Sequence, residues 1–185
     1  MGKFNLFNKN SLVPRTDLVW LTSAEKLRGT RDYLAKNKTD LCVAWFEETH
    51  RLFNRYLNEE NHINIEIKMV ETLRLYDLNN KTAVFLEHYP GYNREENLLS
   101  DNKPAHVCFM SSLDDTFFQL FRGYMDKLVR NMGLEEGQCI EHRMVSNAVI
   151  KAQKGLDKQI PNDFNARSGE EWMNRFRTYY EQHKR

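Results

Sequence analysis

Glu87 and His88 are the residues of this 185-residue chain best suited by type and position to move a proton. They end an apolar run that begins at Ala83, and an abrupt turn at residues 89–91 follows them. In an open sheet of parallel strands, the residues after a strand border the ligand crevice, and histidine titrates near neutral pH. A small hydrolase or transferase is therefore one hypothesis. Because no local motif marks a serine or cysteine nucleophile, we favour a hydrogen-bonded turn or a recognition site.

A second glutamate–histidine pair, Glu141 and His142, suggests a metal site shared with His88. Zinc, however, needs three or four converging ligands. The chain contains no HExxH pattern and no cluster of cysteines and histidines. The sequence therefore predicts no metal ligands, and we interpret His142 as a capping or packing residue.

Further polar residues follow another apolar run, which begins at Leu41. Glu47 and Glu48 come directly after this run, where they either begin a helix or line the same crevice. The candidate crevice residues are Glu47, Glu48, Glu87, His88 and Arg94. Carboxylates outnumber cations in this set, which argues against a polyphosphate ligand.

A serine pair and an aspartate pair end the apolar run at residues 105–110, in the stretch SSLDD. Ser112, Asp114 or Asp115 can accept hydrogen bonds from the free amides of a first helical turn, and acidic groups suit the positive end of a helix. We therefore interpret the aspartate pair as a helix cap rather than as a catalytic dyad.

Segments typical of strands alternate with segments typical of helices, which predicts an α/β fold with a mainly parallel, helix-covered sheet. The expected strands are residues 17–21, 41–46, 63–69, 83–88 and 105–110. Four are continuous apolar runs, as in strands buried on both faces, whereas 63–69 alternates with polar residues and should lie nearer an edge. The residues expected on neighbouring central strands are Val19, Val43, Val84 and Val107.

Helices are expected between and after these strands. Thr22 and Glu25 have the spacing of a capping box, and Gly133 is placed as a left-handed helix stop. The expected helices are residues 22–37, 47–60, the segment from the aspartate pair to Gly133, 142–159 and 168–185.

Composition narrows the class of protein. A formal net charge of +1 gives no field that would attract nucleic acid. No segment approaches the roughly 18 apolar residues of a membrane span, so we expect no membrane insertion. The three cysteines are widely separated, which is typical of reduced thiols in a cytoplasmic protein.

Four stretches carry a resemblance to a known family. They are DLVWLTSAEK at 17–26, SLDD at 112–115, GLEEGQCIEH at 133–142 and AVIKAQKGLD at 148–157. Their order resembles the second nucleotide-binding domain of SecA, the bacterial preprotein translocase motor, and the start of its helical scaffold. The resemblance implies a RecA-like domain, similar to the C-terminal domain of helicases.

The ATPase elements of that family are missing. The family carries G-R-G-T-D and G-R-S-G-R-Q-G elements, whose arginines stabilise charge on the transferring phosphate. In residues 83–115 the only arginine is Arg94, and the chain has no GxxxxGK[ST] loop. The resemblance therefore implies a pseudo-ATPase without a cofactor rather than an autonomous enzyme.

The expected organisation is an N-terminal extension at residues 1–16, a SecA-like α/β domain at 17–157, and a connector with an amphipathic helix at 158–185. That helix stacks aromatic residues on one face, either packed on its own domain, which we favour, or free for a partner. The candidate docking residues are Trp172, Phe176 and Tyr180.

The favoured hypothesis is a non-catalytic, SecA-like binding or regulatory module. The resemblance links it to protein export and makes a translocase component the candidate protein partner. The alternatives are a nucleotide-binding pseudo-motor domain and the hydrolase or transferase that uses Glu87 and His88.

Overall fold

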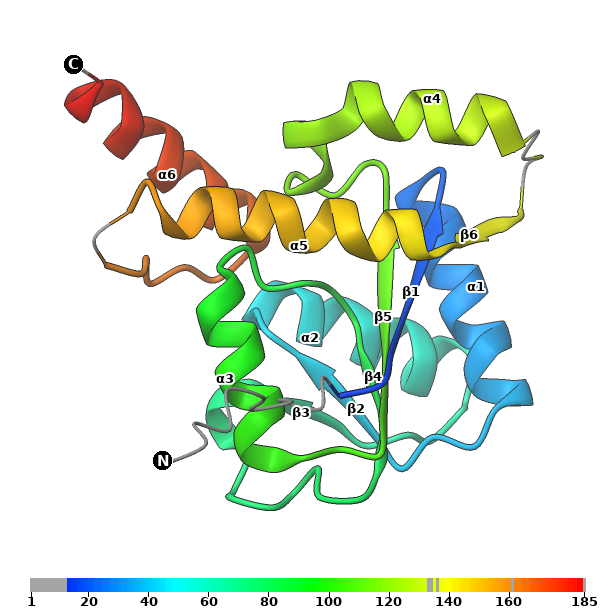
Figure 1. The fold of residues 1–185 in the computed structure, drawn as a ribbon. Helices are drawn as coiled ribbons and strands as arrows, with labels where there is room; N and C mark the ends of the chain where they lie inside the picture. The colour runs from blue at the N-terminus through cyan, green and yellow to red at the C-terminus, as the bar shows by residue number, and fades with distance from the viewer. Residues whose placement is uncertain (1–12, 133–134, 136, 161, 185) are drawn as a thin grey trace, which may run out of the picture.

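The chain folds around one six-stranded sheet with helices on both faces, as Figure 1 shows for the computed structural model. The structure describes residues 13–132, 135, 137–160 and 162–184. The expected helix stop at Gly133 and most of the expected N-terminal extension lie outside the described residues. The α/β class and the mainly parallel sheet that the alternating pattern predicts are confirmed.

The strand order in the sheet is β3-β2-β4-β5-β1-β6, and only β6 runs antiparallel to its neighbour. The strands are β1 Arg15–Trp20, β2 Leu41–Ala44, β3 Ile67–Met69, β4 Thr82–Phe85, β5 His106–Ser112 and β6 Cys139–Glu141. The prediction that residues 63–69 lie at an edge is confirmed by β3. The four central valines lie on β1, β2, β4 and β5, which are neighbours, and all four are fully buried.

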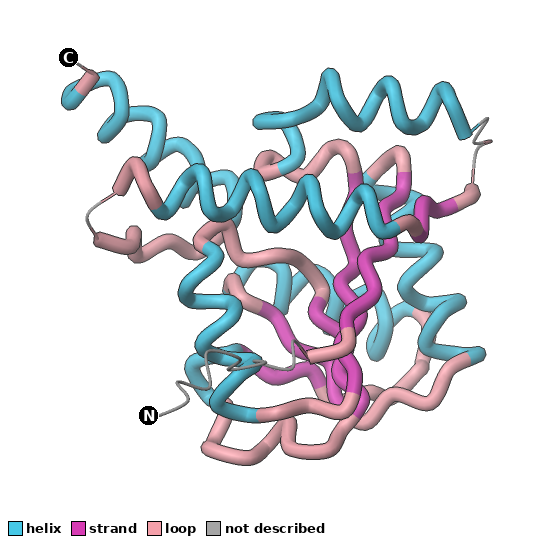
Figure 2. Tube along the Cα trace, viewed as in Figure 1, coloured by secondary structure: helices cyan, strands magenta, loops and turns pink. Residues whose placement is uncertain are grey.

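The described residues form six α-helices, which Figure 2 shows around and beside the sheet. They are α1 Ser23–Lys36, α2 Glu47–Asn54, α3 Tyr92–Asn102, α4 Arg122–Met132, α5 Arg143–Asp157 and α6 Gly169–His183, with a π-helical turn at Arg55–Glu60 and 3-10 turns at Val70–Thr72 and Phe118–Phe121. The capping box of α1 is confirmed, because Glu25 N donates to Thr22 Oγ1 and Thr22 N donates to Glu25 Oε2. Ser168 caps α6, because its Oγ accepts a hydrogen bond from Glu171 N, whereas the Glu171 side chain accepts from Arg167 N.

Two elements of the fold were not predicted. Helix α3 is short and mostly polar, and β6 has only three residues. The strand expected from residue 63 begins only at Ile67, because His62 and Asn64 have positive φ angles of 53° and 54° and interrupt the extended backbone. The backbone N–H and C=O of Ile65 are hydrogen-bonded to the side chain of Asn58 and not to a neighbouring strand.

Each sheet face buries its own apolar cluster. Phe53 of α2 and Leu57 of the π-helical turn pack on one face, whereas Leu99 of α3, Val149 of α5 and Trp172 of α6 pack on the other. Burial of each such side chain contributes about 1.5 to 3 kcal/mol relative to exposure. Both layers therefore hold the carboxyl ends of the strands in fixed positions.

Candidate functional site

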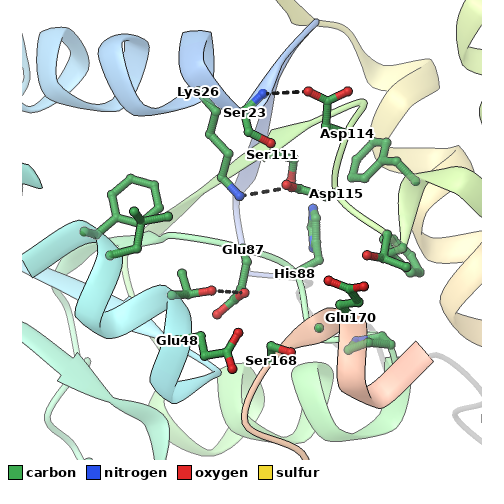
Figure 3. A pocket seen from close by; sticks show the side chains of 18 of the residues that line it. Ser23, Lys26, Glu48, Glu87, His88, Ser111, Asp114, Asp115, Ser168 and Glu170 are labelled. Atoms are coloured by element: carbon green, nitrogen blue, oxygen red, sulfur yellow. Dashed lines mark hydrogen bonds and ion pairs between the residues drawn. The ribbon is translucent and has the colours of Figure 1, made fainter. Parts of the chain in front are cut away.

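A pocket of about 280 Å³ lies at the carboxyl ends of the parallel strands, between the start of α1, the start of α2 and the start of α6 (Figure 3). We call it the carboxyl-edge pocket. Its charged lining residues are Lys26, Glu48, Glu87, His88, Asp114, Asp115 and Glu170. The pocket therefore collects residues that lie up to 147 positions apart in the sequence, which no local motif could indicate.

Glu87 follows β4 and is held by neutral donors from the connection between β2 and α2. Its Oε1 accepts hydrogen bonds from the amides of Trp45 at 3.1 Å and Phe46 at 3.0 Å, and its Oε2 accepts one from Thr49 Oγ1 at 2.6 Å. Burial raises the pKa of Glu87 to about 7, against the opposing charge of Lys26. The carboxylate thus supplies the side-chain cap that α2 lacks at its own N-cap residue, Phe46.

His88, the next residue, lies between two carboxylates. Its Nε2 is 2.8 Å from Asp17 Oδ1 of β1, and its Nδ1 is 3.1 Å from Glu95 Oε2 of α3. The side chains of all three residues are 1% exposed. Burial alone would lower the pKa of His88, but the charge of Glu95 and the hydrogen bond to Asp17 raise it to about 9. At neutral pH His88 is a paired cation with both ring nitrogens occupied, and it stacks on Phe109.

The aspartate pair after β5 joins α1 to the end of the sheet. Asp114 Oδ2 accepts a hydrogen bond from Ser23 N at 3.0 Å, and Asp115 Oδ2 lies 3.0 Å from Lys26 Nζ. Asp115 also accepts from the amide and hydroxyl of Ser112. The expectation that the pair caps the following helix therefore needs correction, because Asp114 caps α1, which is remote in sequence, and the 3-10 turn at Phe118–Phe121 has no side-chain cap.

The candidate crevice residues do not all meet in this pocket. Glu48, Glu87 and His88 line it. Glu47 is exposed on α2, 3.8 Å from Arg51. Arg94 lies on α3 and donates to Asp163 Oδ2 at 2.6 Å, outside the pocket.

Arg94 belongs to a second polar network, which fastens α6 to the domain. Asp163 accepts hydrogen bonds from Arg94, from the Tyr89 hydroxyl and from Trp172 Nε1, the last at 2.9 Å. Trp172 is fully buried and Phe176 is 6% exposed, whereas Tyr180 is 40% exposed. Two of the three candidate docking residues thus pack against the chain's own core.

Sequence reasoning missed several lining residues of the carboxyl-edge pocket. Lys26 was counted with the start of a helix, and Glu170 with the first turn of the terminal helix. Ser111 is the first serine of the pair that ends the apolar run at residues 105–110, and only Ser112 of that pair was considered as a hydrogen-bond acceptor. Ser111 differs from the other lining residues named above because it is 1% exposed and its Oγ has no hydrogen-bond partner among the described residues.

The described residues hold no group of three or more His, Cys, Asp or Glu side chains that could bind a metal ion. Within the same part of the chain, no helix is both long and apolar enough to cross a membrane.

Comparisons with known proteins find stretches that are similar to SecA. No protein-family model matches the chain. A stretch of 81 residues is 37% identical to the protein translocase subunit SecA of Chromohalobacter salexigens and covers 38% of the chain and 9% of that protein. Parts of this chain are similar to SecA.

Two further SecA proteins match other lengths of the chain. The SecA of Rubrobacter xylanophilus is 28% identical over 123 residues, which cover 62% of the chain and 14% of that protein. The SecA of Christiangramia forsetii is 38% identical over 65 residues, which cover 35% of the chain and 6% of that protein. The matched stretches span only about a tenth of the length of these SecA proteins.

Proposed function

We propose that the chain is a SecA-like, non-catalytic module that resembles the second nucleotide-binding domain and binds a protein partner in protein translocation. The similarity to SecA supports the link to translocation. One observation supports the non-catalytic part of the proposal. Carboxylates of the chain itself accept hydrogen bonds from the backbone amides at the helix N-termini that lie at the carboxyl edge of the sheet.

Helix N-termini after parallel strands are the usual places where α/β proteins bind phosphate groups. In this chain the Ser23 amide of α1 donates to Asp114, and the Asn93 amide of α3 donates to Asp157 at 2.8 Å. The amides ahead of α2 donate to Glu87. A polyphosphate that bound at any of these helix starts would have to displace a carboxylate of its own charge sign.

The cations near the pocket are also engaged. Lys26 is paired with Asp115, and His88 is paired with two carboxylates. No other cationic side chain among the described residues lines the pocket. Phosphoryl transfer depends on cations that stabilise the developing charge, so the lining argues against ATP hydrolysis by this chain alone.

The same contacts argue against the acid–base hypothesis. Glu87 already accepts three hydrogen bonds, and both nitrogens of His88 face carboxylates. Both ring nitrogens of His88 are thus engaged, and three of the roughly four acceptor positions of the Glu87 carboxylate are filled.

The test is to titrate the purified chain with MgATP and MgADP by calorimetry and to measure phosphate release. We expect no binding heat and no turnover above background, for the wild type and for Arg94→Ala alike. Turnover that is lost in Arg94→Ala would overturn the non-catalytic proposal.

The link to translocation needs a separate test. The tagged chain should capture translocase components from cytoplasm of its own source, and the captured proteins can be identified by mass spectrometry. Capture of metabolic enzymes alone would contradict the link.

A further inference from the structure

The carboxyl-edge pocket offers hydrogen-bond acceptors in excess of donors. Glu48 and Glu170 are exposed, and within the described part of the chain neither carboxylate has a hydrogen-bond or ion-pair partner. In Figure 3 both point toward the space beside Glu87 and His88. The lining cations are neutralised by other carboxylates, so the free charge of the pocket is negative.

A buried hydroxyl gives an independent sign of a missing ligand. Ser111 lines the pocket, is 1% exposed, and its Oγ has no hydrogen-bond partner among the described residues. A buried polar atom without a partner costs about 1 to 3 kcal/mol. A ligand that donates a hydrogen bond in the pocket would remove this cost.

The walls of the pocket select among cationic ligands. Phe53, Phe117 and Phe118 line it together with Leu27 and Leu52. Such walls suit an aliphatic stem and a planar cation that stacks on aromatic rings. The volume of about 280 Å³ lies just below the roughly 300 to 1,000 Å³ of sites for drug-sized ligands. The pocket therefore suits one side chain better than a nucleotide.

We propose that the carboxyl-edge pocket binds the guanidinium group of an arginine side chain presented by a partner polypeptide. A guanidinium carries five N–H donors and no acceptor, which matches two free carboxylates and an unpaired hydroxyl. The assignment to a polypeptide, rather than to free arginine, rests on the proposed function as a protein-binding module.

The experiment uses a short neutral peptide with one central arginine and its citrulline counterpart, followed by two-dimensional NMR of the labelled chain. Citrulline keeps the shape of arginine and removes the charge. We expect the arginine peptide to shift the signals of residues around the pocket and the citrulline peptide to bind at least about tenfold more weakly. A lysine peptide should fall between them, because its ammonium does not match a fork of acceptors.

The variant Glu48→Gln/Glu170→Gln should weaken the arginine peptide at least about tenfold, since it removes both free carboxylates. The matched control is Glu47→Gln, which neutralises an exposed neighbour outside the pocket. Equal binding of the arginine and citrulline peptides, or unchanged binding by the double variant, would overturn the proposal.

Free N-acetylarginine amide tests whether the pocket prefers an arginine within a polypeptide to a free arginine. Binding as tight as that of the peptide would overturn the polypeptide assignment. Failure of all guanidinium ligands would leave the proposed function standing, because nucleotide titration and partner capture test it separately.

Discussion

Glu87 and His88 are consecutive residues at the end of one strand, yet the protein holds their side chains in opposite ways. Neutral donors, two backbone amides and a hydroxyl, surround the carboxylate of Glu87. Two carboxylates, those of Asp17 and Glu95, surround the imidazole of His88. Both residues follow β4 rather than lie within it, and their side chains join two separate hydrogen-bond networks.

The contrast shows what neutral and charged partners do for a buried ionisable group. The charge of Lys26 and the neutral donors together do not offset the burial of Glu87, whose pKa rises to about 7, toward the uncharged form. Charged partners more than offset the burial of His88, whose pKa rises to about 9 and so toward the charged form. Loss of a partner should therefore be far more costly at His88.

The largest expected effect comes from His88→Phe, which keeps a ring against Phe109 and removes the cation. Asp17 and Glu95 would then lose the cation that lies between them, and Arg15 Nη1 would stay 3.8 Å from Glu95 Oε1. Breaking a buried ion pair in this way costs about 3 to 5 kcal/mol, which urea unfolding can measure. Adding Asp17→Asn should restore part of this loss. A cost below about 1 kcal/mol would mean that charge is not what holds this network.

The next residue, Tyr89, contacts the buried side chain of Trp172, which packs α6 against the core. Its hydroxyl accepts a hydrogen bond from Trp172, whose ring is fully buried against the core. Trp172→Ala should cost about 3 kcal/mol, as for other large truncations in a core, measured by thermal or urea unfolding. The control is Tyr180→Ala on the same helix, which is 40% exposed and should change stability by less than about 0.5 kcal/mol. A melting temperature that Trp172→Ala leaves unchanged would favour a partner-docking role for α6.

The pH dependence of the unfolding free energy should differ between the contributions of His88 and Glu87. A raised pKa contributes stability that is complete below the unfolded pKa and is lost as pH rises through the folded pKa. For His88 that loss runs from about pH 6.5 to 9. Its size should be about 3 kcal/mol, because the pKa rises from 6.5 to about 9 and each pKa unit corresponds to 1.36 kcal/mol. In His88→Phe, unfolding free energies measured between pH 7 and 9 should vary much less than in the wild type.

Glu87→Gln should have the smallest effect, about 1 kcal/mol, because the amide oxygen can still accept from the backbone and only one neutral hydrogen bond is lost. Stability should also become flatter between pH 4.5 and 7, the window set by the raised pKa of Glu87. Thr49→Val is the control for the lost bond, since it removes the donor and keeps the charge. A cost for Glu87→Gln as large as that for His88→Phe would remove the distinction between the two networks.

The sequence predicted what depends on local pattern. Four apolar runs and one alternating segment located five of the six described strands, and the spacing of Thr22 and Glu25 located the start of α1. Helix α3 was not predicted because its mostly polar sequence has little apolar periodicity. Its C-cap residue, which has a left-handed backbone, is Lys103 and not a glycine. Periodicity carries no signal for such an element.

The candidate site was predictable only in part. Glu48, Glu87 and His88 could be placed in the pocket because each follows a strand that ends at the same sheet edge. The contact of Asp114 with Ser23, which lies 91 positions away, depends on the sheet order, and no sequence spacing encodes it. Arg94 was expected in the crevice, but the rotation of α3 turns it toward Asp163.

The position of β1 in the sheet has a consequence for the growing chain on the ribosome. β1 is made before the other strands, yet it pairs only with β5 and β6, and its register partner for Arg15 is Val107. Pairing across such a long loop must await the later segment, and it is entropically slow. Until β5 has been synthesised, the apolar stretch Leu18 to Trp20 has no sheet to enter. This stretch is therefore open to chaperones, and to aggregation, until β5 has emerged.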